Sequence, residues 1–350
     1  MQMNAMLTGQ DEQRGMVWVQ WGFRCAIAML ALIDCWICRF SMNPDGVSYL
    51  DMGDLYWKGN WHAALNSYWS PLYSWLTGLL LLVTKPTMRW EFPEVHLLNF
   101  AISMVALFCF ESFWRELLEY RDDKAWTGSS RPYAWALGYL LFVCVQFGTD
   151  ALELVTPDLL VAALVYGTSA MMLRFAAGRL NIASAGLLGL LLGVGYLAKA
   201  AMLPFAFFMM LTMLAVAWKT NGKKWILGAT LLGFLAVSLP FMTALSWNQR
   251  RITFGDAGRI NQGWLVNRVT PAFRHWQGSK PGHADAQHPT RQIYGGPAVY
   301  EFATPIAGTY PVWYDPSYWY AGLDSSMHPM REVKAFITNM RSIIGSLLSG

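Results

Sequence analysis

The sequence predicts an all-α integral membrane protein with about seven transmembrane helices. The chain of 350 residues is 55% hydrophobic and 14% charged, whereas an average soluble globular chain has about 25% charged residues. It also contains 18 Trp and 19 Phe, and its apolar residues fall into long runs. These observations favour a polytopic membrane protein over a soluble one.

The apolar runs give the expected spans, because about 17–25 apolar residues cross a bilayer as a helix. The runs interpreted as spans are 17–40, 95–114, 133–149, 157–173, 184–198, 201–218 and 225–247. The run 71–84 is short for a span, and the run 335–349 is too short to cross. Lys199 separates two neighbouring spans, so these two are expected to form a broken helix pair.

The basic residues predict the orientation, because Lys and Arg accumulate in short cytoplasmic loops. If 71–84 does not cross, three basic loops lie on the same side as Arg14 and the N-terminus. These loops are 115–132, 174–183 and 219–224. If 71–84 crossed, they would all lie opposite Arg14. The segment 71–84 is therefore expected to be a juxtamembrane helix within a long outer loop, 41–94, and the N-terminus to be cytoplasmic.

This topology divides the chain into three parts. Residues 1–247 form a transmembrane catalytic module, residues 248–334 an external aromatic-rich loop or small domain, and residues 335–350 the start of a further helix. The unusual polar groups then lie together at the outer face: Asp45, Asp51, Asp54, His62, Asp150, Glu153, Asp158 and Lys199. Ionisable groups at membrane depth are costly and point to function, so an active site is predicted at this face.

The stretch NPDGVSYLDMGD, 43–54, contains the first candidate. Asp45 and Tyr49 are four residues apart, so they share one face of a helix that begins after the proline. Asp45 either stabilises the first turn of that helix or acts as a base that takes a proton from an acceptor hydroxyl. Asp51 and Asp54 are expected on a solvated face of the same helix.

Aromatic residues crowd two other stretches, 66–76 and 300–324. In the first, Ser70 precedes a proline suited to the first turn of the juxtamembrane helix. The aromatic residues there suit either an interfacial belt or the wall of a sugar or lipid-phosphate pocket. Those of the second stretch suit stacking on sugar rings, loop packing or a bilayer interface.

Charged residues of two further segments complete the candidate set. Asp158 is expected in the first turn of a span, where the helix dipole favours an acid, and Asp150 and Glu153 precede it. Three acids in this spacing suit a base with its orienting partner, or a divalent cation, although a metal site usually has better-defined ligands. Lys199 either extends to the interface or neutralises a phosphate as a point charge.

Several other classes of site receive no support. The sequence has no dinucleotide glycine motif, no P-loop and no nucleic-acid-binding patch, so neither a soluble nucleotide-sugar donor nor a nucleic-acid partner is expected. The five cysteines lie inside apolar runs and suggest neither a disulfide framework nor a zinc site. No cofactor is predicted with certainty.

The order of these features resembles the polytopic C-fold glycosyltransferases that use lipid-linked donors, in particular the aminoarabinose transferases and the protein O-mannosyltransferase-like proteins of bacteria. In that family an Asp follows the first span, often with an aromatic residue four positions later, as Asp45 and Tyr49 do in PDGVSYL. Asp158 in TPDLL resembles the family's Asp-Pro in reversed order, and Lys199 resembles the basic residue of its broken helix pair. Ser70 stands where the family often has a basic residue.

The resemblance covers roughly residues 40–335 and implies a function. The donor would be a polyprenyl-phosphate-linked sugar, and the acceptor a lipid, glycan or protein at the outer face of the bacterial inner membrane. Asp45 would deprotonate the acceptor hydroxyl, which attacks the anomeric carbon with inversion. Lys199, with Arg residues of 250–274, would hold the leaving phosphate. Family members continue through further spans, so a truncated or minimal version is expected here.

Two other classes of protein remain open. A transporter or flippase for lipid-linked glycans would place its polar groups near mid-membrane and show internal repeats, whereas here the polar groups gather at one face. Asp34, in the outer third of the first span, is either a paired structural residue or part of a transport path. A non-catalytic membrane scaffold is the third alternative.

Overall fold

The computed structural model describes residues 2–121, 130–219, 225–269, 290–302, 308–309, 311–320 and 323–349. The described chain is nearly all helical, and five of its helices contain a segment long and apolar enough to cross a membrane. These segments are Gly15–Ile37, Met88–Tyr120, Asp158–Ala176, Met202–Lys219 and Trp225–Asn248. The predicted class, an all-α integral membrane protein, is confirmed.

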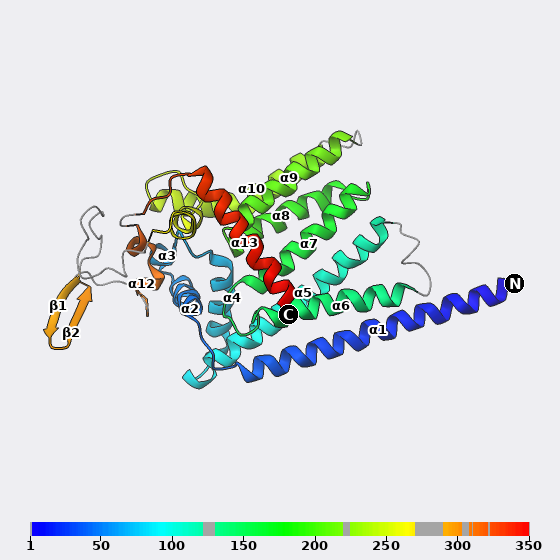
Figure 1. Ribbon diagram of the computed structural model, residues 1–350, viewed down its shortest axis with the longest axis horizontal. Helices are drawn as coiled ribbons and strands as arrows, with labels where there is room; N and C mark the ends of the chain where they lie inside the picture. Colours follow the sequence, from blue (N-terminus) through cyan, green and yellow to red (C-terminus); the bar gives the residue numbers. More distant parts are fainter. Residues whose placement is uncertain are drawn as a thin grey trace.

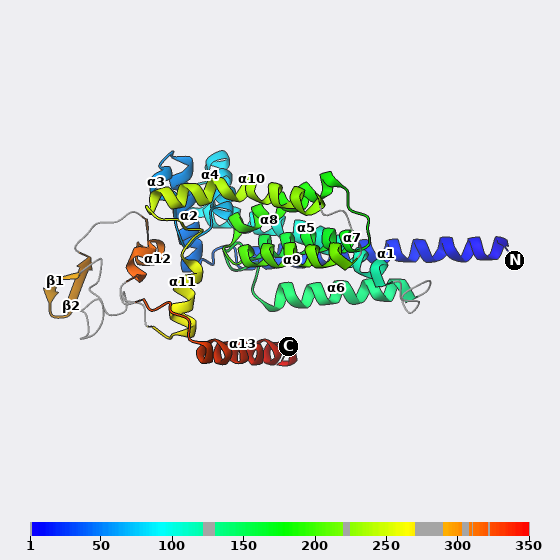
Figure 2. The ribbon, with the colours of Figure 1, turned by 90° about the horizontal axis from the view of Figure 1, so that it is seen from above.

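Seven long helices run together as a bundle (Figures 1 and 2). They are α1 (Gln2–Ile37), α5 (Met88–Arg121), α6 (Arg131–Gly148), α7 (Asp158–Ala176), α8 (Ile182–Ala198), α9 (Met202–Lys219) and α10 (Trp225–Asn248). The helices α6 and α8 run beside the five apolar ones. The closest packing joins α8 to α10, where a Cβ on Gly189 would lie 2.0 Å from the carbonyl oxygen of Thr230. Glycine at this position therefore lets the two backbones touch.

Two helices are longer than the runs that predict them. The helix α1 begins well before the predicted start at residue 17, and α5 extends on both sides of 95–114. An apolar run marks only the part of a helix suited to lipid, whereas polar residues with good helix propensity continue the same helix beyond it. The helix α5 also continues through Pro93, despite the backbone hydrogen bond that a proline removes.

Three shorter helices gather at one end of the bundle: α2 (Pro44–Trp57), α3 (Trp61–Ala64) and α4 (Pro71–Thr84). The bounds of α4 match the predicted juxtamembrane run 71–84, and in Figure 1 α4 crosses the direction of the bundle instead of following it. Glycines bring α2 and α4 together, since a Cβ on Gly78 would lie 2.7 Å from the carbonyl oxygen of Gly53. The expected long loop is therefore mostly helical.

The C-terminal part contains structure that the sequence reading does not predict. Its elements are α11 (Ala257–Asn261), the π-helical turn η3 (Gln262–Val266), β1 (Thr290–Gly295), β2 (Ala298–Phe302), α12 (Pro311–Tyr314), η5 (Pro316–Trp319) and α13 (Pro329–Ser349). The strands β1 and β2 form an antiparallel hairpin, which lies far from the bundle in Figure 1. The helix α13 begins at Pro329, before the expected start at 335, because charged residues form its first turns.

Two buried glutamates inside the bundle are paired with arginines. Glu111 on α5 accepts two hydrogen bonds from Arg24 on α1, at 2.7 and 2.6 Å, and one from Tyr139 on α6 at 2.6 Å. Glu116 accepts from Arg174 and Arg179 at 2.7 and 2.8 Å. A lone charge at this depth is costly, so these contacts fix how α1, α5, α6 and α7 are arranged.

Replacing Glu111 by Gln is expected to lower the free energy of unfolding by about 3–5 kcal/mol, because it leaves a buried partner charge uncompensated. The measurement is SDS-induced unfolding in mixed micelles. Glu119→Gln is the control, since this more exposed carboxylate should contribute less than about 1 kcal/mol. The double variant Arg24→Met/Glu111→Leu should recover most of the loss, and equal effects of Glu111→Gln and Glu119→Gln would contradict the assignment.

Candidate functional site

The candidate site begins at the break between α8 and α9. Lys199 follows the last residue of α8 in an extended conformation, with φ −156° and ψ 134°, and α9 starts at Met202. The predicted broken helix pair is therefore present. The side chain of Lys199 forms an ion pair with Asp158, so a cation and an acid from different helices meet at the same end of the bundle.

Asp158 occupies the first turn of α7, as predicted. The hydroxyl of Thr156 donates to its Oδ2 atom at 2.9 Å, and the helix dipole favours its negative charge. The preceding loop is attached to α2, because the amide of Val155 donates to the side-chain oxygen of Asn43 at 2.9 Å. Asn43 immediately precedes α2, so this bond fixes the start of α2 beside the start of α7.

Asp45 and Tyr49 lie on α2 close to this pair. The indole of Trp313 donates to Oδ1 of Asp45 at 2.8 Å, which connects α2 to a segment far along the chain. Tyr49 is buried, and its burial raises the pKa of its phenol well above the usual range. The negative charges of Asp45 and Asp158 raise it further, so both acids lie within electrostatic range of one phenol.

An aromatic cluster packs against Tyr49 and Trp313, two neighbours of Asp45. Trp69 packs edge-on against Tyr49, with ring centroids 5.4 Å apart, and its indole donates to the carbonyl of Trp313 at 3.3 Å. Tyr73 is fully buried and donates to Asn99 at 2.6 Å. The stretch 66–76 therefore contributes mainly core packing, and neither an interfacial belt nor an open pocket wall describes these two side chains.

Ser70 is buried at the residue before α4, and its side chain makes no capping hydrogen bond. It shares this end of the bundle with Lys199, because Leu72 in the first turn of α4 packs against the cluster that contains Ala198 and Met202. The first amides of α4 thus lie near the helix break, where the positive end of a helix favours an anion.

Asp150 and Glu153 lie elsewhere. Both are exposed in the turn before α7, and both are within electrostatic range of Asp34 on α1. No described hydrogen bond or ion pair joins them to Asp45 or Lys199. Within the described part of the chain, no three His, Cys, Asp or Glu residues come together in a group that would hold a metal ion.

The two remaining acids of α2 differ from one another. Asp54 is exposed and pairs with Lys58 at 2.7 Å, as expected for a solvated face. Asp51 is half-buried and accepts from the amide and hydroxyl of Thr309 at 2.6 and 2.7 Å. Asp51 therefore lies at the surface of the helix but is partly covered, because a distant segment binds its carboxylate.

Sequence reasoning missed Asp256, whose carboxylate is almost completely buried. It accepts from Arg251 at 2.5 and 2.7 Å and from the hydroxyl of Tyr320 at 2.7 Å, while its amide donates to the carbonyl of Ser67 at 2.7 Å. Burial alone would raise the pKa of this carboxyl, but the hydrogen bonds from Tyr320 and Arg251 and the charge of Arg251 outweigh it and lower the pKa. The available signal was a single acid within the basic stretch RRITFGDAGR.

A cavity of about 430 Å³ lies between the start of α9 and the loop that carries Asp256. Its lining includes Ala200 and Ala201, next to the helix break, together with Arg251 and Arg259. Of the arginines expected to assist Lys199, these two share a cavity with the residue that follows it, Ala200, whereas Arg274 lies outside the described residues. The lining also includes Asp256, which forms ion pairs with both arginines. The site thus combines a carboxylate, a paired lysine and a cavity with two arginines and one acid.

No protein-family model, curated protein or solved structure matches this chain. Its function is therefore inferred from its own residues and their geometry.

The stability of the protein should depend on the ionisation of Asp256. Since its folded-state pKa is lower than the ordinary value of 3.8, its contribution is complete above that value and is lost as the pH falls through the lower folded-state pKa. Asp256→Asn should lower the free energy of unfolding near neutral pH by roughly 2–3 kcal/mol and flatten the acid dependence below about pH 4.

Tyr320→Phe, which removes one hydrogen bond and leaves the charge, should have a smaller effect. The measurement is denaturant unfolding in detergent at a series of pH values. A variant Asp256→Asn with the acid dependence of the wild type would contradict this role.

Proposed function

We propose that this protein is a membrane glycosyltransferase that moves a sugar from a polyprenyl-phosphate donor to an acceptor hydroxyl. The observation that carries the proposal is the convergence of Asp45, Asp158 and Lys199 from three separate segments at one end of the bundle. This end also carries the cavity lined by Arg251 and Arg259. Two arginines and one acid, Asp256, line it, so an excess of positive charge remains beside Lys199. A carboxylate near this excess positive charge fits a reaction in which a proton is removed and a phosphate leaves.

In the proposed reaction Asp45 is the base. Its Oδ1 atom accepts from Trp313, which fixes the orientation of the carboxylate, and the other oxygen accepts no hydrogen bond from a described residue. That oxygen takes the proton of the acceptor hydroxyl as the hydroxyl oxygen bonds to the anomeric carbon of the sugar. The bond from this carbon to the phosphate oxygen breaks, and the electron pair leaves with polyprenyl phosphate. Positioning and general base catalysis of this kind are ordinary enzymatic devices.

Lys199 is the group proposed to hold the leaving phosphate. Its side chain is 44% exposed, and that of its partner Asp158 is 47% exposed, so the pair can exchange partners at low cost. Asp158 keeps the hydroxyl of Thr156 and the dipole of α7 when Lys199 turns to a phosphate. The phosphate would then lie near the cavity of Arg251 and Arg259, whose guanidinium groups suit phosphate oxygens.

The proposal also specifies on which side of the membrane the site lies. The basic loops between the spans predict that the end carrying Asp45 faces away from the cytoplasm, where lipid-linked sugar donors rather than soluble nucleotide sugars would be used. In a bacterium this is the outer face of the inner membrane. The acceptor would be a lipid, a glycan or a protein.

The test is transfer from radiolabelled polyprenyl-phosphate sugars by protein reconstituted in liposomes. Asp45→Asn should lower the transfer rate by about a hundredfold or more, the range of a general base. Asp54→Asn is the matched control on the same helix, because Asp54 is exposed and paired with Lys58, and its rate should stay close to that of the wild type.

Transfer that survives Asp45→Asn would remove Asp45 as the base. Flipping of lipid-linked glycans by the wild type, with no transfer from any donor, would overturn the enzyme assignment in favour of a transporter.

A further inference from the structure

The helix α13 has one polar and one apolar face. Its large apolar residues recur at intervals of three and four, which places them on one side of the helix. They are Met330, Val333, Phe336, Ile337, Met340, Ile343 and Ile344, and their side chains are 41% to 81% exposed. Arg331, Lys334 and Thr338 lie on the other side. A strongly amphipathic helix of low net hydrophobicity is typical of a membrane interface.

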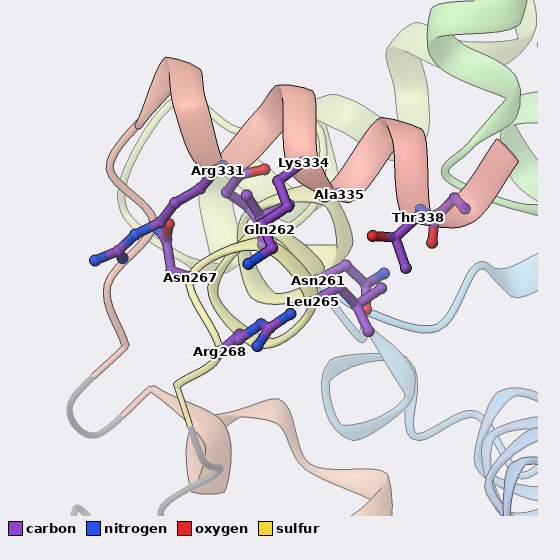
Figure 3. Close-up of a pocket in the computed structure, with 12 residues that line it drawn as sticks. Asn261, Gln262, Leu265, Asn267, Arg268, Arg331, Lys334, Ala335 and Thr338 are labelled. Atoms are coloured by element: carbon purple, nitrogen blue, oxygen red, sulfur yellow. The ribbon is translucent and has the colours of Figure 1, made fainter. Parts of the chain in front are cut away.

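The polar face of α13 packs toward η3 and borders an open cavity of about 610 Å³ (Figure 3). Arg331 and Lys334 of α13 line it, and Arg268 lines it from the segment after η3. The other polar lining residues are Asn261, Gln262, Asn267, Thr338 and Asn339. No acid is among the described residues that line the cavity, so it is suited to an anion.

The backbone positions Arg268 at this cavity. Arg268 adopts a left-handed conformation, with φ +57°, which is uncommon for a residue other than glycine. The neighbouring Asn267 holds the segment, since its side-chain amide donates to the carbonyls of Asp324 and Ser326 at 3.0 and 2.9 Å. Glu332 of α13 accepts from Gln262, and this bond attaches α13 to η3 beside the cavity.

The place of α13 in the fold agrees with a lipid surface. Figure 1 shows α13 lying across the direction of the bundle, and Figure 2 shows it beside the bundle instead of within it. It lies on the side of α11 and η3 toward the spanning helices (Figure 2). Its polar face packs on η3, so its apolar face points away from η3.

We propose that α13 lies in the membrane interface and that the cavity between α13 and η3 binds the phosphate of an anionic phospholipid. The apolar face enters the acyl-chain region while Arg331 and Lys334 reach the headgroups. A phospholipid is the occupant favoured by the structure, because it alone uses the cationic cavity and the adjoining apolar face together. This site does not depend on the glycosyltransferase proposal.

The first experiment measures lipid binding to the purified full chain in neutral detergent by native mass spectrometry. The probes are phosphatidylglycerol, phosphatidylcholine and inorganic phosphate. The wild type should retain phosphatidylglycerol in preference to phosphatidylcholine. The triple variant Arg268→Gln/Arg331→Gln/Lys334→Gln should weaken phosphatidylglycerol binding about tenfold or more, as expected for losing three cations near a headgroup.

The matched control replaces three cations elsewhere, Lys58→Gln/Lys85→Gln/Arg291→Gln, and should bind phosphatidylglycerol like the wild type. Thermal unfolding of both variants checks that each is folded. Equal binding of the two lipids by the wild type, or equal binding by the two triple variants, would overturn the site. If inorganic phosphate displaced phosphatidylglycerol at a similar concentration, the ligand of the cavity would be a soluble phosphate and the lipid proposal would be overturned.

A second measurement tests the location of α13 in liposomes. In a variant whose five cysteines are replaced by serine, a nitroxide at position 336 should be accessible to oxygen dissolved in the acyl chains, and one at 338 to a water-soluble nickel complex. A nitroxide at 336 that is shielded from both reagents would show a protein partner on this face and would overturn the interfacial location.

Discussion

The ion pair between Lys199 and Asp158 is the interaction on which the candidate site depends. It joins the break between α8 and α9 to the first turn of α7. The loop before α7 holds the start of α2 through Asn43, and α2 carries Asp45. Trp313 then connects Asp45 to the C-terminal part of the chain. A lysine at the end of two apolar helices needs a counter-charge, and meeting that need brings the candidate catalytic groups together.

The paired charges of this protein fall into two kinds, and exposure distinguishes them. The side chains of Glu111 and Glu116, inside the bundle, are each 4% exposed and accept several hydrogen bonds. Asp158 and Lys199 are nearly half exposed. Buried pairs whose carboxylates accept several hydrogen bonds fix the helix arrangement. An exposed pair at the end of the bundle can instead exchange one partner for a charged group of a substrate. Because of this difference, we assign a structural role to the buried pairs of Glu111 and Glu116. We propose phosphate binding for the exposed pair of Asp158 and Lys199.

Local chemistry made much of the fold predictable. Prolines mark the starts of α2 and α4, an acid after a proline marks the start of α7, and a lysine between two apolar runs marks the break. The missed features depend on partners far away in the sequence. Arg24 meets Glu111 across 87 positions and Asp256 meets Tyr320 across 64, and a single sequence shows neither pairing. The β1–β2 hairpin was missed because its short strands lie in a polar segment without a sustained alternating pattern.

The most direct test is the affinity of the protein for polyprenyl phosphate. This is the product whose phosphate Lys199 is proposed to bind. Lys199→Met should weaken this binding about tenfold or more, as for a lost hydrogen bond to a charged group. Lys219→Met, at the opposite end of α9, should leave it unchanged. Equal affinities for the wild type and Lys199→Met, in protein of unchanged thermal stability, would contradict the assignment of the helix break as the phosphate site.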